Sequence, residues 1–389
     1  MPVINRLAEF QDDIAAWRHD FHRHPELLYD VHRTAEVVAD RLKSFGVDEI
    51  ATGIGRTGVV GIIHGRMTGG ERTIGLRADM DALPIHEATG KPYASAVPGK
   101  MHACGHDGHT AMLLGAARYL AETRNFDGRA AVIFQPAEEG GAGGKAMVDD
   151  GLMTRFGIEE VYGLHNMPGM PVGRFGIRSG PIMAATDEFD IEIVGHGGHA
   201  AKPHATVDPI LVGAQLVQAL QSIASRAVDP LESVVVSVTT FKAGQAHNII
   251  PGTAALGGTV RSLMPEVRDL AERRLGEIAH GIALAFGAHV EVTYRRNYPV
   301  TVNDPDRADF AAAVARSIVG EANVDTDVAP MMVGEDFSYM LLERPGAFIF
   351  LGNGDTAGLH NPQYDFNDEA IPIGASYLAR LVETALQPR

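Results

Sequence analysis

The chain has 389 residues, of which 45% are hydrophobic and 21% charged, so it can bury a full core without disulfides and is too apolar to be disordered. Lys and Arg total 33 against 49 Asp and Glu, and the net charge of −16 argues against a nucleic-acid-binding protein. The single cysteine, Cys104, excludes an internal disulfide. No stretch reaches the roughly 18 uninterrupted apolar residues of a membrane span. Acidic residues near the N-terminus stand where a signal peptide is apolar, so we expect a cytoplasmic protein.

Apolar periodicity divides the chain into three stretches. The first alternates helices with short apolar strands, which is typical of an α/β sheet whose strand ends carry the functional side chains. Here we predict helices at 7–21, 33–45, 107–120 and 144–152, and strands at 58–63, 73–78, 130–134 and 161–164. The same character returns near the C-terminus, with helices at 305–319 and 370–386 and a strand at 347–351.

The middle stretch has the order β-α-β-β-α-β, which is typical of a ferredoxin-like domain. Its predicted strands are 188–194, 233–241, 255–262 and 289–294, and its predicted helices are 208–223 and 265–285. We therefore predict an α/β catalytic domain, with a mixed sheet flanked by helices, over 1–181 and 296–389. A ferredoxin-like lid domain over 182–295 interrupts it.

Residues 101–109 form the densest group of chemically active side chains. They include Cys104, His102, His106 and His109. Thiolate and imidazole are ligands that bind divalent transition metals, so this group favours a metal site. An isolated cysteine is more often a small buried hydrophobe, but the neighbouring histidines reverse that expectation. His102 and His109 remain open, because either could simply donate or accept a hydrogen bond.

Further polar side chains follow other predicted strands. Asp79 and Asp81 follow one strand, Glu138 and Glu139 a second, His165 ends a third, and His360 lies near the C-terminus. A pair of carboxylates can divide its work, one binding metal and the other acting as a general base. Together these side chains supply enough donors for two adjacent metal ions.

The middle stretch contributes three candidates for substrate binding. His199 and Asn248 could donate hydrogen bonds to a developing oxyanion. Arg261 could hold a substrate carboxylate through two parallel hydrogen bonds, although the residues alone slightly favour a surface salt bridge for an isolated arginine.

These motifs, in this order, resemble the amidohydrolase branch of the dinuclear metallopeptidases. That branch holds hippurate hydrolase, the plant indole-acetyl-amino-acid hydrolases and N-acetyl-diaminopimelate deacetylase. The resemblance runs from His24-Pro25-Glu26-Leu27 to Gln363-Tyr364-Asp365-Phe366-Asn367-Asp368 and so covers nearly the whole chain.

The resemblance implies a role for most of these residues. The implied ligands of two divalent ions are Cys104, His106, Glu139, His165 and His360. Glu138 matches the family's general base, and Asp81 matches an aspartate that orients a metal-bound histidine in relatives. His199 and Asn248 match residues that stabilise the oxyanion, and Arg261 is the candidate for the carboxylate. The roles of Asp79 and Glu335 stay open.

The implied activity is hydrolysis of the amide bond of a small N-acyl amino acid by a metal-activated water. The ligand set is compatible with manganese, zinc, cobalt or nickel. The edge strands of the lid domain could pair with those of a second copy and so form a homodimer. The alternatives are cleavage of short peptides, an amidase with Cys104 as nucleophile, and a binding protein that retains the fold without catalysis.

Overall fold

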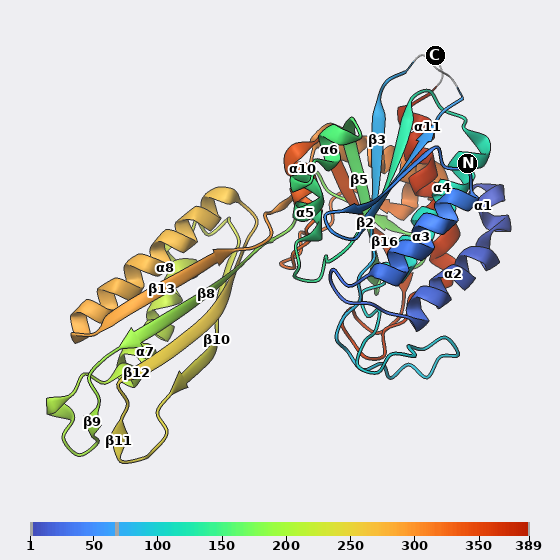
Figure 1. The fold of residues 1–389 in the computed structure, drawn as a ribbon. Helices are drawn as coiled ribbons and strands as arrows, with labels where there is room; N and C mark the ends of the chain where they lie inside the picture. Colours follow the sequence, from blue (N-terminus) through green and yellow to red (C-terminus); the bar gives the residue numbers. More distant parts are fainter. Residues whose placement is uncertain (1–2, 67–69, 388–389) are drawn as a thin grey trace. The chain divides into compact units, whose positions relative to one another are not determined.

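The computed structural model describes residues 3–66 and 70–387, which form two compact units (Figure 1). The larger unit comprises the described residues up to Ile182, Val302–Ala329 and those from Asp336 onward. The smaller unit comprises Met183–Thr301 and Pro330–Glu335. Within the described ranges, no helix has the length and apolar character needed to cross a membrane.

The larger unit is built on a mixed sheet of eight strands, and the predicted α/β class with a mixed sheet is confirmed. The four central strands β3, β4, β5 and β16 run parallel to one another. At one side of them, β2 is antiparallel to β4 and β1 is antiparallel to β2. In order across the sheet, the strands are β1 (Glu49–Ile54), β2 (Gly58–His64), β4 (Arg129–Gln135), β3 (Thr73–Asp79), β5 (Ile158–Pro168), β16 (Gly346–Gly354), β6 (Phe175–Gly176) and β15 (Val324–Asp325). The central strands are buried on both faces, as expected for parallel strands covered by helices.

Helices cover both faces of this sheet (Figure 1). One face carries α1 (Asn5–Glu9), α2 (Gln11–Arg23), α3 (His32–Ser44), α4 (His106–Thr123), α9 (Pro305–Val319) and α11 (Ile371–Ala385). The other carries α5 (Gly143–Asp149), α6 (Leu152–Arg155) and α10 (Ser338–Glu343). The helix predicted at 7–21 is in fact two helices, α1 and α2, which meet at the buried Phe10. A separate two-stranded sheet pairs β7 (Gly180–Met183) with β14 (Thr301–Asn303).

The smaller unit has the predicted β-α-β-β-α-β order. Its elements are β8 (Ala185–Val194), α7 (Pro209–Leu220), β10 (Val234–Ala243), β12 (Thr253–Ser262), α8 (Pro265–Phe286) and β13 (His289–Arg296). The four strands form an antiparallel sheet in the order β10-β12-β8-β13, so β10 and β13 are its edges.

Alternation along β8 explains why this sheet has one covered face. Phe189, Ile191 and Ile193 are buried in a core with α7 and α8, whereas the intervening Asp190 and Glu192 are exposed. A strand with this period of two buries one face and presents the other to water. Beyond the main sheet, the short strands β9 (Gly198–His199) and β11 (Ile249–Ile250) pair with each other.

Candidate metal centre

The predicted metal ligands come from four separate segments of the larger unit. Glu139 follows β4, His165 lies near the end of β5, and His360 lies in the loop after β16. Because these strands are parallel, their carboxyl ends meet at one end of the sheet. Cys104 and His106 reach the same place at the start of α4.

The structure brings all five predicted ligands together, along with Glu138. The donor atoms of three overlapping groups each lie within 4.8 Å of one another: Cys104 with His106 and His165, Cys104 with Glu139 and His360, and His106 with Glu138 and Glu139. Sγ of Cys104 is 3.4 Å from Nε2 of His165, and Nε2 of His360 is 3.3 Å from Oε1 of Glu139. Thiolate, imidazole and carboxylate donors in one cluster are the chemistry of a transition-metal site.

The orientation of the histidine rings fits a cation at the centre of this cluster. Nδ1 of His106 donates to the carbonyl of Asp81 at 2.8 Å, and Nδ1 of His165 donates to the carbonyl of Asn166 at 2.7 Å. Each ring therefore turns Nε2 toward the other donors. Nε2 of His106 is buried and has no hydrogen-bond partner among the residues that the structure describes. A buried polar atom without a partner is unfavourable, and a bound divalent ion would satisfy it.

Backbone conformation at Gly105 allows Cys104 and His106 to point into the same site. Gly105 has φ +87, a left-handed conformation that favours glycine. A Cβ atom at this position would lie 2.3 Å from Nδ2 of Asn166 and 2.4 Å from the hydroxyl of Tyr364. Only glycine therefore fits between Cys104 and His106.

Asp81 holds the backbone of the two neighbouring glutamates, Glu138 and Glu139. Its two carboxylate oxygens accept hydrogen bonds from the backbone N–H groups of Glu138 and Glu139, each at 3.0 Å. The preceding Ala137 has φ +55, which is uncommon for a residue with a side chain. Asp81 is fully buried, so these two hydrogen bonds hold the turn that carries both glutamates.

The three residues predicted to bind substrate lie at two separate places in the smaller unit. His199 and Asn248 are exposed neighbours, because β9 pairs with β11 and the carbonyl of Asn248 accepts a hydrogen bond from the N–H of Ala200 at 3.1 Å. Arg261 lies eight residues beyond Thr253 in β12, and its guanidinium donates to the carbonyl of Val260 at 3.0 Å. At about 3.3 Å per residue, Arg261 is about 26 Å along the strand from the end that leads to β11.

The profile of peptidase family M20/M25/M40 matches residues 75–384, which includes every segment of the metal cluster. The chain belongs to this family.

Individual members of the M20 family support the same assignment. The chain is 44% identical over 381 residues to a hippurate hydrolase of Campylobacter jejuni, covering 98% of both sequences. It is 37% identical to an N-acetylcysteine deacetylase of Bacillus subtilis, covering 97% of this chain and 98% of the relative. A crystal structure of a dinuclear metal-binding M20 peptidase from Bacillus subtilis superposes with a TM-score of 0.85 at 34% identity, covering 97% of this chain and 99% of that one. The chain is therefore a member of a family with dinuclear metal-binding enzymes.

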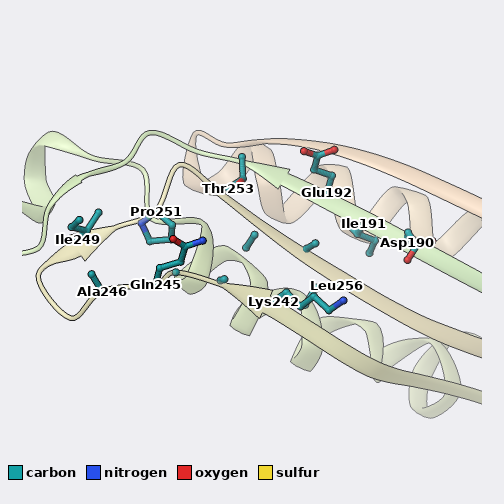
Figure 2. A pocket seen from close by; sticks show the side chains of 14 residues that line it. Asp190, Ile191, Glu192, Lys242, Gln245, Ala246, Ile249, Pro251, Thr253 and Leu256 are labelled. Atoms are coloured by element: carbon teal, nitrogen blue, oxygen red, sulfur yellow. The ribbon is translucent and has the colours of Figure 1, made fainter.

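A cavity of about 760 Å³ lies in the smaller unit (Figure 2). It is lined by residues of β8, β10, β12 and the hairpin that joins the last two strands, including Asp190, Glu192 and Lys242. His199, Asn248 and Arg261 are absent from its lining. The lining of this cavity contains none of the residues of the metal cluster, so the cavity does not identify the metal site of this M20 protein.

Several residues around the metal cluster have no assigned role in the sequence analysis. Asp79 is buried, and its carboxylate accepts hydrogen bonds from Arg77 at 2.7 Å and from His109 at 2.7 Å. Asp336 in turn accepts a hydrogen bond from Arg77 at 3.0 Å. The sequence signals for His109 are its place in the 101–109 group and its position three residues after His106, which brings it to the same side of α4.

Proposed function

We propose that this M20 protein is an amidohydrolase that cleaves the amide bond of N-acyl amino acids with the help of two divalent metal ions. The observation that carries the proposal is the convergence of the Cys104, His106, Glu139, His165 and His360 donor atoms beside Glu138. The names of the relatives point to the substrate class, since one hydrolyses hippurate and another deacetylates N-acetylcysteine.

In this proposal, the five donors would hold the two ions, and Glu138 would act on a proton instead of binding metal. Manganese, zinc, cobalt and nickel all suit a mixture of thiolate, imidazole and carboxylate ligands. When bound, the ions would polarise the scissile carbonyl and lower the pKa of the attacking water.

Glu138 would act as general base and then as general acid. Its carboxylate takes the proton of the attacking water and delivers it to the nitrogen of the leaving amino acid. Asp81 would hold Glu138 in place through the peptide N–H that it binds. Because the acceptance and the delivery of the proton use one carboxylate, the position of Glu138 would govern both halves of the reaction.

The smaller unit would serve as a lid that completes the site. His199 and Asn248 would donate hydrogen bonds to the tetrahedral oxyanion, and Arg261 would bind the carboxylate of the amino acid. Closure of such a lid would exclude bulk water from the reaction.

We further propose a homodimer formed through the smaller unit. A small substrate cannot touch both ends of β12, so Arg261 and the His199–Asn248 pair of one protomer cannot serve one substrate together. A second protomer would supply one of them. Exposed apolar side chains on the edge strand β10 and on α7 offer a surface for this contact, among them Val235, Phe241, Ile210 and Leu211. A cytoplasmic location is proposed as well, since a single thiol that binds metal suits a reducing compartment.

Cleavage of short peptides is the second candidate function. A thermostable carboxypeptidase of Saccharolobus solfataricus is 40% identical over 381 residues, and the hydrolysis of a peptide bond needs the same chemistry. A Cys104 nucleophile is disfavoured because it leaves Glu138, Glu139 and His360 without a role.

The test is a panel of N-acetyl, N-benzoyl and indole-acetyl amino acids and dipeptides, assayed with purified protein before and after chelation. We expect hydrolysis of at least one N-acyl amino acid that is lost on chelation and restored by manganese, zinc, cobalt or nickel. Turnover that survives complete metal removal would instead favour the Cys104 nucleophile, and turnover of dipeptides alone would favour the peptidase.

A further inference from the structure

The ring of His109 lies inside the metal cluster, yet both of its nitrogens are already engaged. Nδ1 is 2.7 Å from Oδ1 of Asp79, and Nε2 is 3.0 Å from the backbone nitrogen of Asn166. A backbone N–H can only donate, so Nε2 accepts and carries no proton. Nδ1 therefore carries the proton and donates it to Asp79. His109 is left without a lone pair for a cation, although its position groups it with Asp79 and His106 as a potential metal site.

Asn166, which donates hydrogen bonds to His109, is connected to two of the predicted ligands, Cys104 and His165. Asn166 directly follows His165, and its side-chain amide donates to the carbonyl of Cys104 at 2.6 Å. The same amide lies 3.1 Å from Nε2 of His109, so His109 receives hydrogen bonds from both the backbone and the side chain of Asn166. Through these bonds, α4 is joined to the end of β5.

The position of His109 is itself held by buried charge. Oδ2 of Asp79 accepts a hydrogen bond from Arg77, whose positive charge compensates the negative charge of the carboxylate. His109 can therefore stay neutral. The hydroxyl of Thr110 donates to the carbonyl of Asp79 at 2.7 Å. Asp79 thus selects one tautomer and one orientation of the His109 ring, as carboxylates do for histidines beside metal sites.

We infer that His109 is a positioning residue, which fixes the spacing between the Cys104 thiolate and the His165 imidazole and thereby raises the affinity of the site for metal. This inference rests on the proposed function, because it takes Cys104 and His165 as ligands. It gives Asp79 a role as well, which is to hold His109 as a neutral acceptor rather than to bind metal.

The experiment uses cobalt(II), because a thiolate bound to cobalt produces a charge-transfer absorption band that reports on Cys104 directly. The chelated protein is titrated with cobalt as the unaltered protein and as His109→Leu, His109→Gln and Leu120→Ala. Leu120 is buried in the same helix α4 and its truncation weakens the fold without touching the centre, so it is the matched control. Cys104→Ser identifies the band.

We expect His109→Leu to weaken cobalt binding about 10- to 100-fold, with a shifted or weakened thiolate band. The Gln side chain can still accept a hydrogen bond from Asn166 but cannot also reach Asp79. The cobalt affinity of His109→Gln should therefore lie between that of His109→Leu and that of the unaltered protein. Leu120→Ala should lower the melting temperature of the chelated protein and leave cobalt affinity unchanged.

Two results would overturn the inference while leaving the proposed metal centre intact. One is an unchanged cobalt affinity and band in His109→Leu. The other is the loss of one whole equivalent of cobalt in His109→Gln, which would make His109 a ligand. A third result, no thiolate band in the unaltered protein, would overturn the assignment of Cys104 as a ligand and this inference with it.

Discussion

The carboxylate of Asp81 accepts a hydrogen bond from the backbone N–H of Glu138 at 3.0 Å, and its other oxygen binds the N–H of Glu139 at the same distance. Asp81 therefore holds the proposed base Glu138 and the proposed ligand Glu139 through their peptide N–H groups. A buried carboxylate that accepts two backbone donors leaves little freedom to the turn that it holds.

Replacement of Asp81 by asparagine should lower kcat about 100-fold, because the new NH₂ group faces a backbone donor and shifts Glu138 by a fraction of an ångström to about 1 Å. Bound metal, measured by elemental analysis, should stay near its original level. Asp306→Asn, which alters an exposed aspartate, is the control and should leave kcat unchanged. An Asp81→Asn enzyme with full activity would show that the turn keeps its geometry without these bonds.

Replacement of Glu138 by glutamine preserves size and removes basicity. We expect kcat to fall by about 10²- to 10⁴-fold, which is the usual contribution of general acid–base catalysis, while the metal content is retained. The neighbouring Glu139→Gln should instead lose metal. If the Glu138 variant loses metal in proportion to its activity, Glu138 is a ligand and another group must act as base.

Replacement of Gly105 by alanine should prevent normal metal binding. The φ of +87 disfavours any side chain, and the added Cβ would meet Asn166 and Tyr364 at 2.3 and 2.4 Å. Gly46→Ala is the matched control, because Gly46 has φ +76 but open space around its Cβ position. Both variants should lose about 1–3 kcal/mol of unfolding free energy from backbone strain, and Gly105→Ala should lose metal affinity as well. Equal metal affinity in the two variants would count against the tight fit at Gly105.

Stability of the smaller unit should depend on the pair between Arg268 and Asp187. Nε of Arg268 donates to Oδ2 of Asp187 at 2.9 Å, and Asp187 is only 1% exposed. Arg268→Ala should reduce the free energy of unfolding by about 3–5 kcal/mol, because it leaves a buried carboxylate without its cation. Arg273→Ala removes an exposed pair with Glu277 in the same helix and should leave the free energy of unfolding nearly unchanged, because solvent screens an exposed ion pair. Denaturant titration measures the free energy of unfolding of both variants. A similar decrease in Arg268→Ala and Arg273→Ala would show that the burial of the Arg268–Asp187 pair is unimportant.

The proposed dimer predicts complementation between two inactive variants. His199→Ala and Arg261→Ala should each have low activity alone. After mixing under conditions that exchange subunits, half of the dimers are mixed, and one of their two sites combines an intact Arg261 with an intact His199. Activity should then recover to about a quarter of the unaltered level. A mixture that stays as inactive as its components would place both residues in the site of a single protomer.

Much of the fold could be predicted because its central strands are short, mostly apolar segments such as Ala130–Phe134 and Ala347–Leu351. The strand β1 was not predicted, since only its last side chain is buried and the others show no period of two. The two-residue strands β9 and β11 are too short for any periodic signal. The break at Phe10 was also missed, because the buried side chains on both sides of it keep a helical spacing.

The donor types in the sequence predict that these side chains gather at one place, and the structure brings them together, but the supporting contacts could not be predicted. The bonds of His109 to Asp79 and Asn166 join α4 to β3 and β5, and nothing within any one of these segments signals the other two. The distance between Arg261 and His199 likewise depends on the length of β12 and its register with β8, which only the folded sheet reveals.

The proposed metal ligands come from four segments that are distant in the sequence, and this has a consequence for the lifetime of the protein. An ion held by α4, the loop after β4, β5 and the loop after β16 would cross-link parts of the chain that an unfolded molecule lets drift apart. Free metal at 100 times its dissociation constant would then stabilise the folded state by about 2.7 kcal/mol. A cell that runs short of metal would therefore lose more than catalytic turnover, since the emptied protein would unfold more often and become a better substrate for proteolysis.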